Sequence, residues 1–194
     1  MENITNNHMH FLLKILKSPE EEYNANSIAK KMGISSMGAL KIAKSLEKEG
    51  ILITKQMGRA KFYKINLEND YAKQYVKFLL RREAELSSPS IKRWISEIKK
   101  IKNASLAILF GSVLRNEREA KDIDVLLIAN NKSFKMLKKE IKEINLINTK
   151  QLHPIYQVEE DIKNNIKKGD KVVLNAIKGI VVFGEDMLIS MLEK

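Results

Sequence analysis

Three segments near the start of the chain space their apolar residues as amphipathic helices do: residues 8–17, 27–32 and 36–49. Gly33 supplies a turn before the third segment, which Ser35 or Ser36 can cap. Gly50 can close that segment in the left-handed conformation. A strand pattern at residues 51–55 follows, and a turn at residues 57–60 connects it to a second strand pattern at residues 61–66. The pattern predicts a helix-turn-helix followed by a β-hairpin.

The rest of the chain alternates helical and strand patterns. A helix over residues 71–86 should end at the Ser-Ser-Pro-Ser break of residues 87–90. The elements expected beyond it are helices at 91–101, 134–146 and from 159 onward, including 172–178, and strands at 104–110, from 122, at 147–158 and at 180–183. This alternation predicts an α/β (α+β) fold with a small mixed sheet flanked by helices. We expect domains at residues 1–69 and 91–194, connected by residues 70–90.

The connecting helix has an apolar face of its own. Tyr71, Tyr75 and Leu79 recur every four residues, with Ala72 and Val76 beside them. This face either packs against its own domain or joins two copies of the chain. We expect a homodimer.

The third predicted helix has two distinct sides when it is projected at its helical period. Ala39, Leu40, Ala43 and Leu46 form a core-facing side, and Met37, Lys41, Lys44 and Lys48 form a second side. Three helices and a basic-tipped hairpin resemble the winged helix-turn-helix DNA-binding domains. The resemblance implies double-stranded DNA as partner, with the lysine side in the major groove and Arg59 and Lys61 on the hairpin near phosphate or the minor groove. A solvated lysine face and a protein-binding winged helix are the alternatives.

A second motif lies between two apolar strands. Gly111 and Ser112 follow the strand at 104–110, and nine residues separate Ser112 from Asp122. Gly111 permits a tight turn in which backbone N–H groups and the Ser112 hydroxyl can approach phosphate oxygens. Asp122 and Asp124 are two residues apart in a strand, so their carboxylates share one face and can hold Mg²⁺ carried by a triphosphate.

This pattern resembles the nucleotidyltransferase superfamily related to DNA polymerase β, particularly its minimal (MNT-type) members. The resemblance implies that Gly111, Ser112 and Arg115 bind a nucleoside triphosphate, with ATP the first candidate. It also implies that Asp122 and Asp124 are catalytic and hold Mg²⁺ or Mn²⁺. An ordinary turn with two solvated aspartates is the alternative, but adjacent carboxylates repel each other, which favours a metal site.

The resemblance also implies a third carboxylate on a later strand, and the sequence departs from it there. Lys150-Gln151-Leu152-His153-Pro154 looks like the Arg-Glu-Ile-Asn-Pro segment of some regulator-linked relatives, so Gln151 stands in the acid's position. His153 lies two residues away on the same face and is a candidate base, although a histidine in a strand is more often structural. Glu159 or Glu160 could also reach the site.

Composition adds little to these motifs. The net charge of +11 at pH 7 favours a polyanionic partner such as nucleic acid. The sequence has no cysteine and only three histidines, which argues against disulfides and structural zinc. No apolar run is long enough to span a membrane and no signal peptide pattern is present, so we expect a cytoplasmic protein without a membrane partner.

Two functions from different classes follow. In the first, the chain transfers a nucleoside monophosphate to a hydroxyl group on protein or RNA. Minimal members often act as antitoxins beside a separate HEPN-type toxin, which makes such a toxin a candidate partner. In the second, Gln151 leaves the transferase domain catalytically degenerate, and the chain is a DNA-binding regulator that senses nucleotide or uses the domain for assembly.

Overall fold

The computed structural model describes residues 5–193 and divides them into two compact units. The division falls between Leu79 and Leu80, inside helix α4 (Asp70–Glu85), and residues 192 and 193 group with the first unit. The predicted break at residues 87–90 instead separates α4 from the next helix. The mixed α+β architecture predicted from the sequence is confirmed.

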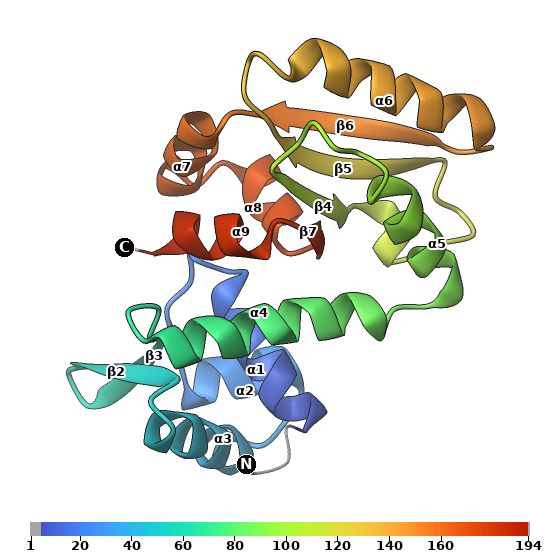
Figure 1. Ribbon diagram of the computed structural model, residues 1–194. Helices are drawn as coiled ribbons and strands as arrows, with labels where there is room; N and C mark the ends of the chain where they lie inside the picture. Colours follow the sequence, from blue (N-terminus) through green and yellow to red (C-terminus); the bar gives the residue numbers. More distant parts are fainter. Residues whose placement is uncertain (1–4, 194) are drawn as a thin grey trace. The chain divides into compact units, whose positions relative to one another are not determined.

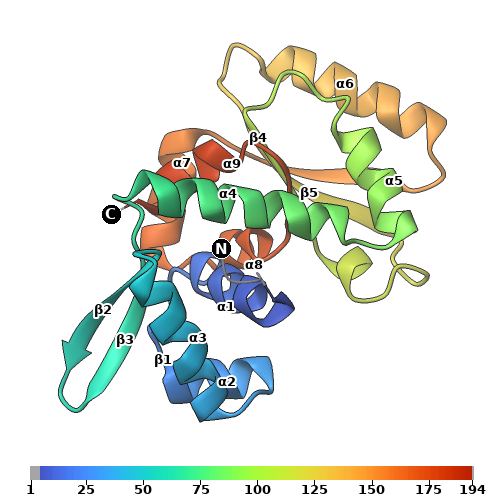
Figure 2. The same ribbon diagram turned by 60° about the horizontal axis from the view of Figure 1, so that its bottom comes forward.

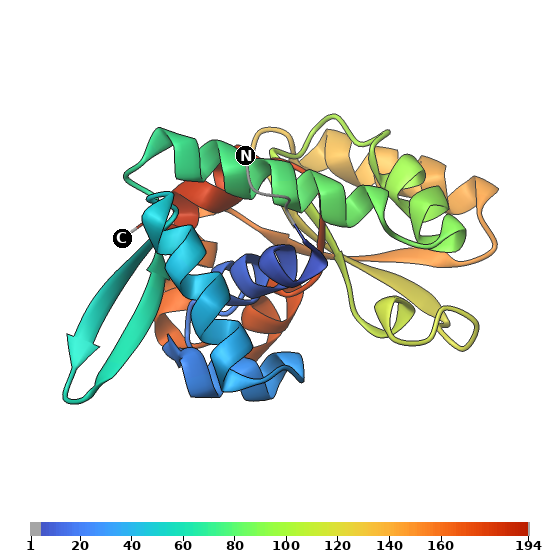
Figure 3. The same ribbon diagram turned by 90° about the horizontal axis from the view of Figure 1, so that it is seen from below.

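The first unit contains three helices and a small antiparallel sheet: α1 (Asn6–Leu16), β1 (Tyr23–Asn24), α2 (Ala25–Met32), α3 (Ser36–Lys48), β2 (Leu52–Met57) and β3 (Ala60–Ile65). The strand order is β1-β3-β2, and Figures 2 and 3 show the β2–β3 hairpin extending away from the helices. The helix-turn-helix and the hairpin lie where the sequence predicts them. Strand β1 was not predicted, because two residues are too few to show an alternating pattern.

Local capping groups fix the helix-turn-helix. The Ser35 hydroxyl accepts a hydrogen bond from the Gly38 amide and so begins α3, whereas Asn24 and Ser27 form a capping box that begins α2 earlier than predicted. Gly33 ends α2 with φ +67° and Gly50 follows α3 with φ +72°, both in the left-handed region that favours glycine.

The core of the first unit corrects one part of the α3 prediction. Ala39, Ala43 and Leu46 are buried as expected, but Leu40 is only half-buried and Ile42 occupies the core instead. Leu40 lies at one edge of the predicted core-facing side, and Ile42 lies just beyond the opposite edge. The buried side of α3 is therefore rotated slightly about the helix axis from its predicted position. The side that carries the lysines stays in solvent.

Helix α4 buries one face and exposes another. Ala72, Val76 and Leu79 are fully buried, whereas Tyr71 and Phe78 keep 46% and 48% of their surface exposed. Packing within the chain therefore accounts for the buried face, and homodimer formation stays a prediction. None of the helices in residues 5–193, α4 included, is long and apolar enough to cross a membrane.

The second unit is a four-stranded sheet with helices on both faces. Its elements are α5 (Pro89–Ile98), β4 (Leu106–Phe110), the 3₁₀ turn η1 (Ser112–Leu114), β5 (Asp122–Ile128), α6 (Phe134–Ile147), β6 (Gln151–Gln157), α7 (Glu159–Lys168), α8 (Lys171–Ile177), β7 (Ile180–Phe183) and α9 (Glu185–Leu192). The strand order is β6-β5-β4-β7, with β5 and β6 parallel and the other pairs antiparallel (Figure 1). This is the mixed sheet that the sequence predicts.

The apolar residues buried on one face of the sheet determine which side chains lie on the other face. Ile123, Val125 and Leu127 of β5 join Trp94 of α5 and Ile141 of α6 in one apolar cluster. Because side chains alternate along a strand, the residues between them point to the opposite face. That face is covered further along by α8, which contacts β4.

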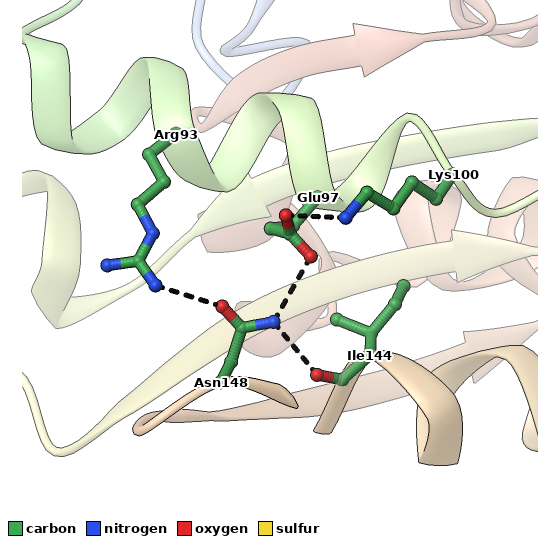
Figure 4. Close-up of polar contacts among 5 residues, drawn as sticks. All are labelled: Arg93, Glu97, Lys100, Ile144 and Asn148. Carbon is green, nitrogen blue, oxygen red and sulfur yellow. Dashed lines mark hydrogen bonds and ion pairs between the residues drawn. The ribbon is translucent and has the colours of Figure 1, made fainter. Parts of the chain in front are cut away.

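A polar network joins α5 to the end of α6, as Figure 4 shows. The Asn148 amide donates to the Ile144 carbonyl at 2.8 Å and to the Glu97 carboxylate at 3.1 Å. Arg93 donates to the Asn148 side-chain oxygen at 3.2 Å, and Lys100 donates to Glu97 at 2.6 Å. The hydrogen bond from Lys100 is the main cause that lowers the pKa of Glu97, with the bond from Asn148 assisting.

We expect Glu97→Gln to lower the free energy of unfolding by about 1 kcal/mol at neutral pH, because a charge-assisted bond to Lys100 is lost. The pKa of Glu97 is lower in the folded state, so its contribution is present above the unfolded pKa and is lost as pH falls through the folded value. Urea unfolding should show the difference from wild type shrinking in acid.

Glu143→Gln is the matched control for this prediction. Its carboxylate lies 3.8 Å from Lys139 and both side chains are more than 60% exposed, so the pair should contribute little. An equal loss of stability in both variants would contradict a structural role for the Glu97 network.

Candidate functional site

The two predicted aspartates lie at the start of β5, on the face opposite the α5–α6 core. Ile123 between them is fully buried, Asp122 is exposed and Asp124 is half-buried. In the parallel register with β6, Asp122 lies opposite Gln151 and Asp124 lies opposite His153. Leu152 is buried beside Ile123 in the core. Four polar residues therefore form a two-by-two arrangement at one end of the sheet.

The Asp124 carboxylate is held between two neighbours. One oxygen, Oδ1, lies 3.3 Å from Nδ1 of His153. The other, Oδ2, lies against the Cα atom of Gly111, and a Cβ atom built on Gly111 would overlap it. Gly111 also has φ +87° and ψ −153°, which L-residues rarely adopt. Both its backbone and its surroundings therefore require glycine.

The Gly-Ser turn follows directly from β4. Phe110, the last residue of β4, pairs with Asp124, so the turn begins beside the aspartates. Ser112 opens η1 and is half-buried, and Arg115 follows the turn with its side chain exposed. The structure thus brings Gly111 and Ser112 close to Asp124 and leaves the Arg115 guanidinium in solvent nearby.

The loop between Arg115 and Asp122 is held by contacts that the sequence did not predict. The Ser88 hydroxyl, which caps α5, donates to the Glu117 carboxylate, and Lys150 donates to the Glu117 carbonyl at 2.8 Å. The sequence predicted only a break between helices at residues 87–90, and the Glu117 partner of Ser88 is distant in sequence. Glu117 therefore connects the start of α5 and the start of β6 to the loop that carries Arg115.

The other candidate acids lie elsewhere. The Gln151 amide, level with Asp122, donates to the Asn145 carbonyl at 3.1 Å. Glu159 begins α7 beyond the far end of β6, where it pairs with Lys163 at 2.7 Å. With a rise of about 3.3 Å per residue, that end is about 20 Å from Asp122. The sequence left open whether Glu159 or Glu160 reaches the aspartates, and the position of α7 places both acids away from them.

The donor set fits a metal-bound triphosphate in its chemistry. Asp122 and Asp124 supply hard oxygens on one face, and the absence of a side chain at Gly111 leaves the space that the Asp124 carboxylate occupies. Within residues 5–193, no group of three or more His, Asp or Glu side chains is placed so that it could hold a metal ion by itself. A cation bound here would take its remaining ligands from the triphosphate and water.

The candidate DNA-binding residues of the first unit all reach solvent. Met37 is 61% exposed, and Lys41, Lys44 and Lys48 lie with it on the same side of α3. Arg59 lies in the β2–β3 turn and Lys61 is exposed on β3. Within the described part of the chain, none of these five cations forms an ion pair. Their charge is available to an external polyanion.

Comparison with known families addresses the second unit. Residues 91–183 match the family model described as nucleotidyltransferase domain. This part of the chain is therefore similar to the nucleotidyltransferase domains. This match confirms the resemblance inferred from Gly111, Ser112, Asp122 and Asp124 at the level of the domain family. No curated protein matches the sequence.

Solved structures give only distant similarities. A point mutant of ZitR from Lactococcus lactis is 15% identical with a TM-score of 0.32, and the match covers 50% of this chain and 72% of that one. The adhesin competence repressor AdcR from Streptococcus pyogenes is 17% identical with a TM-score of 0.33, covering 61% of this chain and 85% of that one.

We expect Gly111→Ala in the second unit to weaken triphosphate binding and to cost about 1–3 kcal/mol of stability, because the added Cβ meets the Asp124 carboxylate at a positive φ. Gly169→Ala is the matched control, since Gly169 has φ +71° but open space around it. Calorimetric titration and urea unfolding measure the two effects. Equal nucleotide affinity in both variants would contradict the importance of this contact.

Proposed function

We propose that the nucleotidyltransferase domain transfers a nucleoside monophosphate from a triphosphate, with ATP the first candidate, to a hydroxyl group on protein or RNA. The acceptor oxygen attacks the α-phosphorus, the bond from that phosphorus to the pyrophosphate oxygen breaks, and pyrophosphate leaves with the displaced electron pair. The acceptor proton passes to a base or to water.

Each site residue has a distinct task in this proposal. Asp122 and Asp124 hold Mg²⁺ or Mn²⁺, which supplies charge stabilisation at the phosphate oxygens when bound. Backbone N–H groups after Gly111 and the Ser112 hydroxyl bind phosphate oxygens. Arg115 is exposed beside the turn, and its planar guanidinium suits a phosphate.

One observation carries the proposal. The Asp124 carboxylate packs against Gly111 at the point where the Gly-Ser turn leaves β4. This contact brings the Asp124 carboxylate and the backbone amides of the turn close together, which supports the proposal that they bind one cation and one triphosphate. An ordinary turn would have no reason to exclude every side chain at Gly111. The match of residues 91–183 to the nucleotidyltransferase domain supports the same chemistry.

A second candidate function rests on Gln151. Its amide is engaged by the Asn145 carbonyl, and a neutral amide neither holds a cation firmly nor accepts a proton. If no other group replaces the missing acid, the domain binds nucleotide without transferring it. The chain would then be a regulator whose second unit senses nucleotide or serves for assembly.

We infer that the first unit binds double-stranded DNA in either case. Its exposed cations lie on α3 and on the β2–β3 hairpin, the two elements that a winged helix presents to the major groove and to phosphate. Lysine contacts to phosphate give affinity that depends strongly on salt and little on sequence. A separate HEPN-type toxin is a further candidate partner.

Asp122→Asn and Asp124→Asn should each reduce transfer of α-labelled nucleotide by at least about a hundredfold, because the cation's charge stabilisation is worth several kcal/mol. The assay uses all four triphosphates with the protein itself, tRNA and cell lysate as acceptors. Asp161→Asn, an exposed acid on α7, is the control that should transfer normally. Absence of transfer by wild type that still binds nucleotide would favour the regulator instead.

Lys44→Ala and Arg59→Ala should weaken DNA binding and each reduce the slope of log affinity against log salt by roughly one. Lys139→Ala, an exposed lysine on α6, is the matched control and should leave both quantities unchanged. Fluorescence anisotropy of a labelled duplex over a range of salt measures them. An equal effect of all three substitutions would indicate general charge attraction and contradict the proposed DNA surface.

A further inference from the structure

The first unit contains a cavity that neither the aspartate site nor the candidate DNA surface uses. Its volume is about 360 Å³, which lies near the lower end of the range in which proteins bind small molecules. The end of α1, the segment between α1 and β1, and the β2–β3 hairpin form most of its wall. All of its wall residues belong to the first unit, so the cavity exists within that unit alone.

Apolar side chains make up most of the wall of this cavity. Leu16, Ile65 and Leu67 are buried, whereas Ile15 and Phe62 are half-buried and keep part of their surface accessible. An apolar group that enters the cavity removes this surface from water, which is the main source of affinity in sites of this kind. The wall therefore favours a ligand with an apolar body.

Two lysines in the wall favour a ligand with negative charge. Lys55 pairs with Phe62 across the hairpin, and Lys64 is the next residue after Phe62 on the same face of β3. The two cations thus flank one aromatic ring. Both side chains are exposed, and neither forms an ion pair with another residue in the described part of the chain. Their charge is available to a ligand in the cavity.

Two acids also line the cavity, but they do not cancel the cations around it. Glu21 accepts a hydrogen bond from Lys31 of α2 at 3.1 Å, so its charge is already neutralised by a residue outside the wall. Glu22 is exposed and offsets the charge of one wall lysine. The wall residues together with Lys31 therefore keep one net positive charge.

We propose that this cavity binds a small amphipathic carboxylate, with its carboxylate group between Lys55 and Lys64 and its apolar body against the apolar wall. Charge-assisted hydrogen bonds from an ammonium group to a carboxylate are stronger than those between neutral groups. An anion placed between two cations also removes their mutual repulsion. The inference depends neither on nucleotide transfer by the second unit nor on DNA binding by the first.

Three compounds separate the two features of the proposed ligand. Octanoate has both a carboxylate and an apolar chain, octylamine keeps the chain but carries a positive charge, and acetate keeps the carboxylate without the chain. Isothermal titration calorimetry measures the binding of each compound to the full chain. We expect octanoate to bind in a one-to-one ratio and at least about tenfold more tightly than either of the other two.

Variants of the wall residues locate the bound ligand. Ile15→Trp enlarges a wall residue and should abolish octanoate binding, whereas Ile53→Trp makes the same change at an exposed residue outside the wall and should not affect it. Lys55→Gln and Lys64→Gln should each weaken octanoate binding about threefold, as expected for loss of an exposed charge. Lys30→Gln, which changes an exposed lysine on α2, is the control for both.

The results decide for or against the inference directly. Tighter binding of octanoate that Ile15→Trp abolishes and the two wall lysine variants weaken supports it. An octanoate affinity no greater than that of octylamine or of acetate would overturn the proposed class of ligand. Octanoate binding that Ile15→Trp leaves intact, or that Lys30→Gln weakens as much as Lys55→Gln does, would place the ligand elsewhere. If Ile15→Trp does not fold, the comparison of the exposed lysine variants still decides.

Discussion

The close approach of Gly111 to the Asp124 carboxylate is the contact on which the site depends. This contact requires that β4 ends beside the start of β5, that Gly111 has a positive φ, and that the turn carries no side chain there. Together these requirements place the backbone of the Gly-Ser turn beside the Asp124 carboxylate. The rest of the second unit keeps this contact in place.

The hydrophobic core sets the direction of the functional side chains. Ile123 and Leu152 are buried under α5 and α6, so Asp122, Asp124 and His153 must point to the other face. The network around Asn148 joins the ends of α5 and α6, as Figure 4 shows. The Glu117 contacts to Ser88 and Lys150 then fix the loop above the aspartates. Packing and polar contacts thus preorganise the site together.

Local patterns predicted much of this structure. The shared face of Asp122 and Asp124 follows from the two-residue period of a strand, and the capping of α3 by Ser35 follows from residue type and position. The contact of His153 with Asp124 could not be predicted, because it depends on the register between β5 and β6, strands separated by a whole helix. The same holds for Glu117, whose partners are distant in sequence, and for the division of the chain inside α4.

The most direct test of the central claim is a crystal structure of the full chain with α,β-methylene-ATP and a divalent cation. The account predicts triphosphate oxygens at the Gly111–Ser112 turn and a cation bound by Asp122 and Asp124. Nucleotide bound elsewhere, or bound with both aspartates free of the cation, would contradict it.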